Sequence, residues 1–178
     1  IDSDVNYDWN FLNYPIHTIS AKPEQTSKEC AILLIHGFGA STDHWRFNIP
    51  ILSSKYEVHA MDLLGFGKSP KPQDVEYSGS LWKDQVVAYV KEKIKKPTIV
   101  VGNSLGGYAA LAAGAELNDL NAGVILLNAA GYFSEEKTIK KNMLQTSIET
   151  VAGIFLKNIV LQRLIFENMR NPKNIKKT

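Results

Sequence analysis

The sequence has little of what several classes of protein depend on. Its 178 residues include one cysteine, Cys30, so an intrachain disulfide is impossible and a reducing compartment fits best. No cluster of cysteine and histidine has the spacing of metal ligands. We therefore expect no metal and no other cofactor. We also expect a cytoplasmic protein, or a plastid protein if the source is a plant or an alga.

Long apolar runs are also missing. No stretch approaches the roughly 20 residues that span a bilayer, and the best candidate, residues 151–166, is interrupted by Lys157, Gln162 and Arg163. The chain opens on Ile1 rather than on methionine and shows no signal pattern, so we expect the natural N-terminus to lie upstream.

A large net charge is absent as well. The chain carries 20 Lys and Arg against 18 Asp and Glu, a net charge of +2, which gives no indication of a nucleic-acid partner. The charge is unevenly spread, because residues 134–178 hold 9 basic and 4 acidic residues whereas residues 1–133 hold 11 and 14. We interpret the basic tail as a solvated helical face; attraction to an anionic substrate or a membrane surface is the alternative.

Buried-strand patterns alternate with helical patterns over residues 31–128. The expected strands are 31–35, 56–61, 98–101 and 123–128, and the expected helices are 42–52, 78–95 and 106–117. Thr42 or Asp43 is the expected cap of the first helix, and Ser78 or Ser80 that of the second. Residues 14–21 are expected to form an edge strand. This order predicts an α/β fold with a mostly parallel sheet and helices on both faces.

The pattern changes after Gly131, where only helical spacing continues. Ser134 begins a helical pattern with acidic residues in its first turn, and apolar residues recur at roughly helical spacing up to Ile159. We therefore predict an α/β core over residues 1–131 and a helical cap or lid over residues 132–178.

The richest motif is Gly102-Asn-Ser104-Leu-Gly106, which lies between a β-branched run and a small-residue helix. Such a Gly-x-Ser-x-Gly sequence is a nucleophile elbow when a strand precedes it and a helix follows it. The turn is so tight that the serine must adopt a strained backbone, and a Cβ at either glycine would clash. Ser104 is therefore the candidate nucleophile, and the amide of Leu105 lies at a helix N-terminus, where it can stabilise an oxyanion.

Three motifs in this order resemble the α/β hydrolases over nearly the whole chain. They are His36-Gly37-Phe38-Gly39 after one strand, Asp62-Leu-Leu-Gly-Phe-Gly-Lys-Ser69 after the next, and the elbow at Ser104. Within that superfamily the chain is similar to the cap-bearing branch, which includes epoxide hydrolases, haloalkane dehalogenases and the pheophytinase-like hydrolases of plants and cyanobacteria. The first two normally place Asp at the elbow. Serine therefore favours an ester or thioester hydrolase, with the pheophytinase-like group as the nearest match.

The resemblance implies roles for the residues around Ser104. The backbone amides of Phe38 and Leu105 are expected to form the oxyanion hole. His36, with Gly37, is expected to order the loop beside that hole as a structural histidine, not to act as the general base. Asp62 is expected to hold the turn that follows it.

The remaining aromatic and histidine residues are given structural interpretations. Trp45 and Trp82 are expected to pack helices rather than to bind substrate. His17 and His59 are expected to be half-exposed on strands, and His44 to lie at the surface.

Two further motifs are rejected. Gly67-Lys68-Ser69 imitates the end of a phosphate-binding loop, but Asp62 stands where the first glycine is required. Gly37-Phe-Gly39 imitates a dinucleotide fingerprint, but Thr42 stands at its third glycine.

The catalytic partners of Ser104 are missing from the sequence. In this fold the acid and the histidine follow the serine, yet all four histidines precede Ser104. We therefore expect a fragment, truncated at its C-terminus, with an incomplete sheet and a partial cap. Residues 123–128 should form an exposed apolar sheet edge. The 178 residues alone should be poorly soluble and, lacking the acid and base, at least about a thousandfold short of full activity.

The functional prediction is a serine hydrolase that forms an acyl-enzyme at Ser104 and acts on an ester or thioester of a hydrophobic small molecule. Two alternatives stay open at this level. One is a ligand-binding or receptor protein that keeps the fold without the chemistry. The other is a different reaction of the same triad, such as C–C bond hydrolysis or cofactor-free peroxidation.

Overall fold

A computed structural model describes residues 4–6, 9–23 and 29–130 of the chain. They all belong to one unit, Ile1–Tyr132. The cap predicted over residues 132–178 lies outside the described residues. In the described part, no helix has the length and apolar character needed to cross a membrane.

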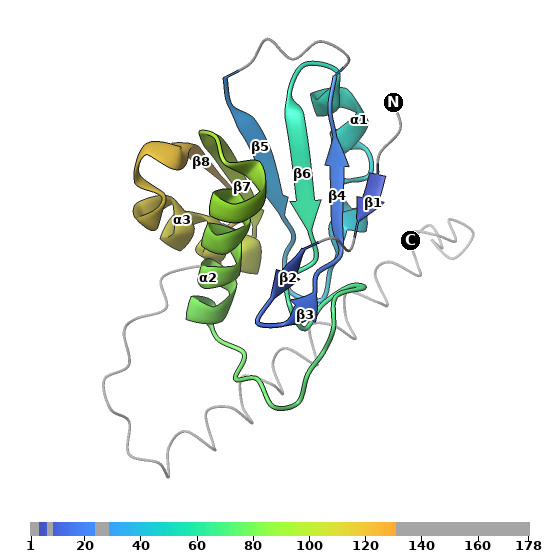
Figure 1. Cartoon of the computed structure of the whole chain (residues 1–178), viewed down its shortest axis with the longest axis vertical. Coiled ribbons are helices and arrows are strands. Elements are labelled where there is room, and N and C mark those ends of the chain that lie inside the picture. Colours follow the sequence, from blue (N-terminus) through green and yellow to red (C-terminus); the bar gives the residue numbers. More distant parts are fainter. Residues whose placement is uncertain (1–3, 7–8, 24–28, 131–178) are drawn as a thin grey trace, which may run out of the picture. The chain divides into compact units, whose positions relative to one another are not determined.

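A six-stranded sheet forms the centre of this unit, in the order β1-β4-β6-β5-β7-β8 (Figure 1). The strands are β1 (Asp4–Asn6), β4 (Thr18–Ala21), β5 (Ala31–Ile35), β6 (Glu57–Met61), β7 (Thr98–Asn103) and β8 (Asn121–Leu127). Strands β6, β5, β7 and β8 are parallel neighbours, and β4 runs antiparallel to both β1 and β6. The predicted fold class is confirmed. Because parallel strands end at the same edge of a sheet, the loops after β5, β6 and β7 meet at one edge.

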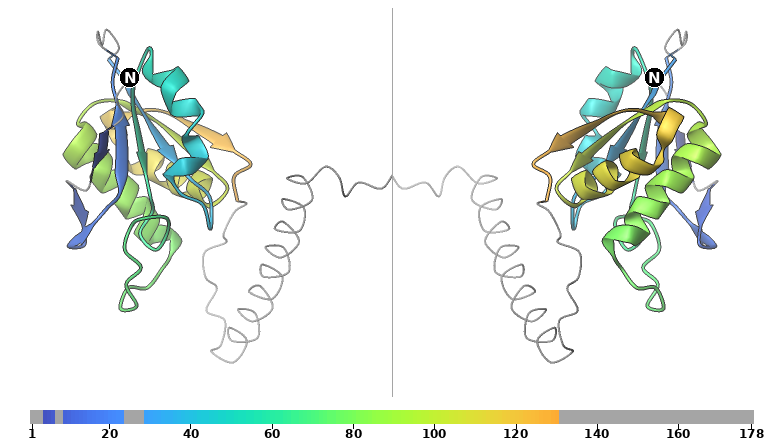
Figure 2. Two further views of the ribbon diagram at one scale, coloured as in Figure 1. Left: turned by 90° about the vertical axis from the view of Figure 1, so that its right-hand side faces the viewer. Right: turned by 90° about the vertical axis from the view of Figure 1, so that its left-hand side faces the viewer.

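Helices cover both faces of the sheet (Figure 2). One face carries α2 (Gly79–Tyr89), which continues as a short π-helix (Val90–Ile94), and α3 (Leu105–Glu116). The other carries a 3₁₀ helix, η1 (Thr42–Trp45), and α1 (Asn48–Ser53). Alternate residues of β5 enter two separate cores, since Leu33 packs with the α2 and α3 side chains while Ile32 and Leu34 pack with Trp45 and Ile49.

The strand predicted over residues 14–21 is interrupted. Its first part, β3 (Tyr14–Pro15), pairs with β2 (Asn10–Phe11) in a separate hairpin whose turn residues, Leu12 and Asn13, have positive φ angles of 51° and 66°. Its second part, β4, lies between β1 and β6 rather than at the edge. The prediction of an edge strand is wrong because β4 also pairs with the short β1. The alternation of apolar and polar residues within 14–21 does not reveal which strands will pair with it.

The helix predicted over residues 42–52 forms two pieces, η1 and α1. Its cap is Ser41, whose Oγ accepts a hydrogen bond from the Asp43 amide at 3.3 Å, and not Thr42 or Asp43. Thr42 is already the first residue of η1 and is buried, so the residue before it provides the cap. The second cap is Ser78, as one of the two predicted alternatives, and its Oγ accepts from the Leu81 amide at 3.2 Å.

Strand β8 is the last strand of the described sheet. Three consecutive apolar side chains on it are open to solvent: Ile125, Leu126 and Leu127 are 48%, 43% and 39% exposed. Apolar edge strands are normally covered or paired. The predicted exposed apolar edge is therefore present in this structure.

Candidate active site

Ser104 is the single residue between β7 and α3, and its backbone is strained. Its backbone angles are φ 51° and ψ −114°, a region that non-glycine residues rarely adopt. Such a conformation costs about 1–3 kcal/mol and persists only when the surrounding structure enforces it. The strain predicted for the elbow is confirmed, and it places Ser104 at the edge of the sheet where the parallel strands end.

The two glycines of the elbow allow backbones to meet directly. A Cβ added to Gly102 would lie 2.1 Å from the carbonyl oxygen of Gly106. A Cβ added to Gly106 would lie 2.4 Å from the carbonyl oxygen of His36 and 2.5 Å from that of Ile35. Helix α3 therefore packs so closely on β5 and β7 that only glycine fits at these positions, as the motif predicts.

The loop after β5 lies directly beside the serine. Ile35 pairs with Gly102 across the parallel ladder, and a Cβ added to Gly37 would lie 3.2 Å from the Cβ of Ser104. The amide of Leu105 is the first of α3 and therefore belongs to the donors that helix geometry leaves unpaired. The structure thus brings the Phe38 loop and the Leu105 amide to Ser104; their role as oxyanion donors stays a prediction.

His36 fastens this loop to the end of β6. Its Nε2 accepts a hydrogen bond from the Leu63 amide at 3.1 Å, so its Nδ1 carries the proton and donates to the Gly37 carbonyl at 2.7 Å. The side chain is fully buried, and burial lowers its pKa. Both nitrogens are thus engaged within the protein, which agrees with a structural histidine; its role in the site stays a prediction.

Asp62 connects three segments of the site. One carboxylate oxygen accepts from the Thr42 amide at 2.6 Å, and the other accepts from the Lys68 amide at 2.7 Å and lies 3.0 Å from His17 Nδ1. The side chain is fully buried. The bond to Lys68 confirms the predicted turn-holding role. The bonds to Thr42 and His17 were not predicted, because they join residues that lie 20 and 45 positions away in the sequence.

Two histidines are more buried than predicted. His17 is 1% exposed and His59 is 6% exposed, so the expectation of half-exposed strand residues is wrong for both. His59 lies 3.0 Å from Glu57 Oε1 and 3.2 Å from the Tyr89 hydroxyl. The hydrogen bond with His59 is the largest cause that lowers the pKa of Glu57, with Lys96 and Lys22 as further partners. Polar partners on other elements make burial possible, and alternation along one strand does not show them.

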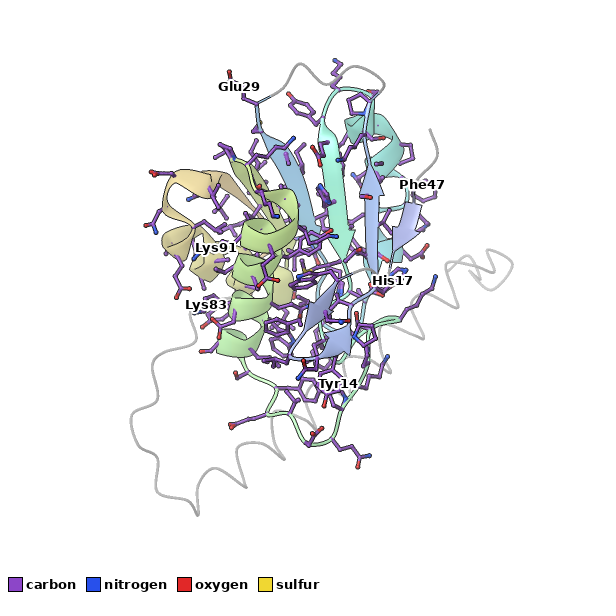
Figure 3. The ribbon with its side chains drawn as sticks, in the orientation of Figure 1. Tyr14, His17, Glu29, Phe47, Lys83 and Lys91 are labelled. Carbon is purple, nitrogen blue, oxygen red and sulfur yellow. The ribbon has the colours of Figure 1, made fainter. Side chains whose placement is uncertain are left out.

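Figure 3 shows His17 and Tyr14 at the end of the sheet toward which β6 points, and Glu29 at the opposite end. His44 is exposed on η1, as expected. His59 lies on β6, separated from β7 by β5. The histidines of the chain therefore have structural or surface positions, and none is assigned as the base of Ser104.

Burial of His17 and His36 predicts a pH-dependent stability. Burial lowers the pKa of both side chains. As the pH falls through about 6.5, these histidines become protonated in the unfolded chain but stay neutral in the folded chain. The free energy of unfolding should therefore be independent of these two histidines above pH 6.5. Below pH 6.5 it should decrease by up to about 1.4 kcal/mol per pH unit for each histidine. Urea unfolding at pH 8, 7, 6 and 5 measures this slope.

The matched control for this slope is His44→Gln, which changes an exposed histidine. His17→Asn should reduce the slope between pH 6.5 and 5 to the contribution of His36, and His44→Gln should leave it unchanged. The Glu57 carboxylate, whose pKa is lowered, loses its contribution only as the pH falls below about 4.5. A flat profile above pH 5 in the unmodified protein would contradict the assignment.

A groove of about 510 Å³ opens next to the Phe38 loop. It is lined by Phe38, Gly65, Phe66, Lys71, Pro72, Gln73, Tyr77 and Trp82. Of these, sequence reasoning singled out only Phe38 for the site. Gly65 and Phe66 lie in the Asp62–Ser69 motif and Trp82 was expected to pack a helix, while no motif marks Lys71, Pro72, Gln73 or Tyr77. Trp82 packs in the core, as expected, and one side of it also lines the groove. Trp45 is only a core residue.

In residues 4–6, 9–23 and 29–130, no group of three or more His, Cys, Asp or Glu side chains is placed to hold a metal ion.

The candidate site consists of a strained serine, two loops and a groove at the end of a parallel sheet. Together they define an α/β protein with a strained serine at the turn from a parallel strand to a helix.

Comparison with known proteins identifies the family. The model of the alpha/beta hydrolase fold matches residues 31–169, and the chain belongs to this family. Pheophytinase, chloroplastic, from Arabidopsis thaliana is 32% identical over an alignment 178 residues long. The alignment covers 82% of this chain and 37% of the relative. The resemblance to the α/β hydrolases, and within them to the pheophytinase-like group, is confirmed.

Other relatives carry different hydrolase names. The 2-hydroxy-6-oxo-6-(2'-aminophenyl)hexa-2,4-dienoic acid hydrolase of Metapseudomonas resinovorans is 36% identical over 119 residues, 62% of this chain and 39% of the relative. Among solved structures, a bacterial membrane phospholipase A has a TM-score of 0.64 and 31% identity, covering 76% of this chain and 42% of that one. The meta-cleavage product hydrolase of Pseudomonas fluorescens IP01 has a TM-score of 0.60 and 28% identity, covering 70% and 46%. The chain thus spans less than half the length of these relatives.

Proposed function

We propose that the protein is a serine hydrolase that cleaves an ester or thioester of a hydrophobic small molecule. The observation that carries this proposal is the strained Ser104 at the strand-to-helix elbow, with the Gly37 loop packed against it. A strained elbow exposes the hydroxyl for attack on a carbonyl carbon. The esterase, lipase and other hydrolase names of the relatives support the same reaction class.

In the proposed reaction, the Ser104 hydroxyl loses its proton to a base while its oxygen attacks the carbonyl carbon. The amides of Phe38 and Leu105 stabilise the negative charge on the carbonyl oxygen, a contribution of about 3–4 kcal/mol for a single donor. The alcohol or thiol then leaves with a proton from the same base. Water next attacks the acyl-enzyme, releases the carboxylic acid and restores the hydroxyl.

The acid and the base of this reaction are proposed to come from a longer protein that contains this chain. His17, His36 and His59 are buried among their own partners, and His44 lies on the surface. A serine hydroxyl needs an adjacent base at neutral pH. The 178 residues by themselves should therefore bind substrate weakly and turn it over poorly.

A second candidate reaction is supported by two relatives. One is named a dienoic acid hydrolase and another a meta-cleavage product hydrolase. The same serine and amides could serve the hydrolysis of a carbon–carbon bond next to a ketone, since a ketone oxygen also develops negative charge in that step.

A substrate panel separates the two candidates. The full-length protein would be assayed with methyl esters, acyl thioesters and 2-hydroxy-6-oxo-dienoates of matched size. The proposal predicts that kcat/KM for the better of the ester and thioester series exceeds that for the dienoates by at least about 100-fold, or about 2.7 kcal/mol of transition-state free energy. A preference for the dienoates would instead select the second candidate.

A further inference from the structure

The groove beside the Phe38 loop is built from a continuous set of aromatic rings. Phe38 contacts Phe66 edge to face, with ring centroids 5.3 Å apart, and Phe66 lies 5.7 Å from Trp82. Trp82 is in turn stacked with Tyr77 at 6.4 Å and an interplanar angle of 26°. We call these four side chains, with Gly65, the aromatic groove. They join the loop after β5, the loop after β6 and helix α2.

The polar atoms of these rings are turned to the protein. The Tyr77 hydroxyl donates to the Pro72 carbonyl at 2.7 Å, and Trp82 Nε1 donates to the Leu64 carbonyl at 3.0 Å. The Lys71 ammonium, which also borders the groove, donates to the Gly67 and Ser69 carbonyls at 2.7 and 3.2 Å. With these groups bound internally, the groove offers mainly carbon surface to a ligand.

The loop that carries Tyr77 is held in place by hydrogen bonds within the protein. Tyr14 on β3 donates from its hydroxyl to Asp74 at 3.2 Å, and the Gly65 amide donates to the Pro70 carbonyl at 2.9 Å. Gly65 has a φ of 94°, and a Cβ there would lie 2.6 Å from the Tyr77 ring. The Tyr77 ring thus packs against a position where a side chain would meet it, and contacts within the protein set the place of this ring in the groove.

Two of the rings are left open despite their size. Phe38 is 51% exposed and Tyr77 is 40% exposed. Phe38 follows Gly37, the residue packed on Ser104, so one end of the groove lies at the loop that borders the nucleophile. A ligand held there would place its reacting group near the elbow.

We propose that the aromatic groove binds an aromatic ring of the substrate, so that the protein prefers aryl-bearing substrates to saturated ones of the same size. The expected preference in kcat/KM rests on the proposed hydrolase function. The expected preference in binding depends only on the groove. Aromatic pairs contribute beyond the area they bury, in an amount that corresponds to about threefold to tenfold in affinity.

The test compares ligands of the same carbon skeleton, one aromatic and one saturated in each pair. Binding of 2-naphthol and of decahydro-2-naphthol to the full-length protein is measured by titration calorimetry. In parallel, kcat/KM is measured for methyl 3-phenylpropanoate and methyl 3-cyclohexylpropanoate. The aromatic member should be favoured about threefold to tenfold in both pairs. Tyr77→Leu should lower both ratios, because it removes one of the two rings of the groove that are most open to a ligand.

Phe47→Leu is the matched control, because Phe47 is an aromatic residue of α1's cap that is 71% exposed on the opposite face of the sheet. It should leave both ratios unchanged. Equal binding of the two naphthols, or a preference that Tyr77→Leu leaves undiminished, would overturn the proposal. If a segment of the protein itself fills the groove, neither naphthol binds, and that result also overturns it. Aromatic preference in binding without any ester turnover would instead count against the hydrolase function alone.

Discussion

Ser104→Ala is expected to lower kcat for ester hydrolysis by the full-length protein by about 10⁴- to 10⁶-fold. The substitution removes the atom that forms the covalent bond, and serine hydrolases that lose their nucleophile fall by this amount because the rest of the triad then contributes little. KM should change much less, since the groove and the Phe38 loop are untouched. Initial rates with a chromogenic ester measure both constants.

The matched control is Ser54→Ala. Ser54 is exposed at the end of α1, where its hydroxyl donates to the Ile51 carbonyl at 2.7 Å. It should keep kcat within about twofold of the unmodified protein, as surface substitutions usually do. Ser104→Ala should also unfold at an equal or higher urea concentration than the unmodified protein, because alanine removes no buried contact. A Ser104→Ala variant that retained more than a few per cent of kcat would exclude Ser104 as the nucleophile.

Gly102→Ala is expected to destabilise the fold by about 3–5 kcal/mol, at the upper end of single substitutions. The new Cβ would meet the Gly106 carbonyl oxygen at 2.1 Å and the Gly107 amide nitrogen at 2.6 Å. Both contacts are with backbone, so no side chain can rotate away. Relief would require α3 to move off the sheet, which also displaces Ser104. Urea unfolding followed by circular dichroism measures the loss.

Gly39→Ala provides the comparison for this loss. Gly39 has a φ of 69°, but no atom lies within 4 Å of the position of its Cβ. Alanine there should cost only the conformational strain of a left-handed residue, about 1–2 kcal/mol. If Gly102→Ala were as mild as Gly39→Ala, the close approach of α3 to β7 would be wrong.

The elbow could be predicted from sequence because its determinants are local. Gly102, Ser104 and Gly106 lie within five residues, and a tight turn requires them whatever the rest of the fold does. The same holds for β5 and β7, whose continuous apolar runs indicate strands buried on both faces.

The network around Asp62 could be predicted only in part. Its bond to Lys68 closes a local turn, which a motif describes. Its contact with His17 joins the loop after β6 to the segment before β4. This contact depends on the antiparallel pairing of β4 with β6. The residue pattern of either strand does not show which strand it will pair with. The burial of His17 was missed for this reason.

The aromatic groove shows a further limit of reading one sequence. Phe38, Phe66, Tyr77 and Trp82 lie on three segments, and each one alone is most simply a packing residue. The chain topology brings the ends of β5 and β6 together and lays α2 beside them. The resulting surface is a property of the fold, which no spacing in the sequence expresses.

Labelling with a serine-reactive fluorophosphonate, followed by mass spectrometry, tests the central claim most directly. The account predicts that the full-length protein carries the phosphonyl group on Ser104. We also expect the 178-residue chain alone to be labelled at least about a thousandfold more slowly, because the acid and the base are proposed to lie in the rest of a longer protein. Labelling at a residue other than Ser104, or equal labelling rates for the chain and the full-length protein, would contradict the account.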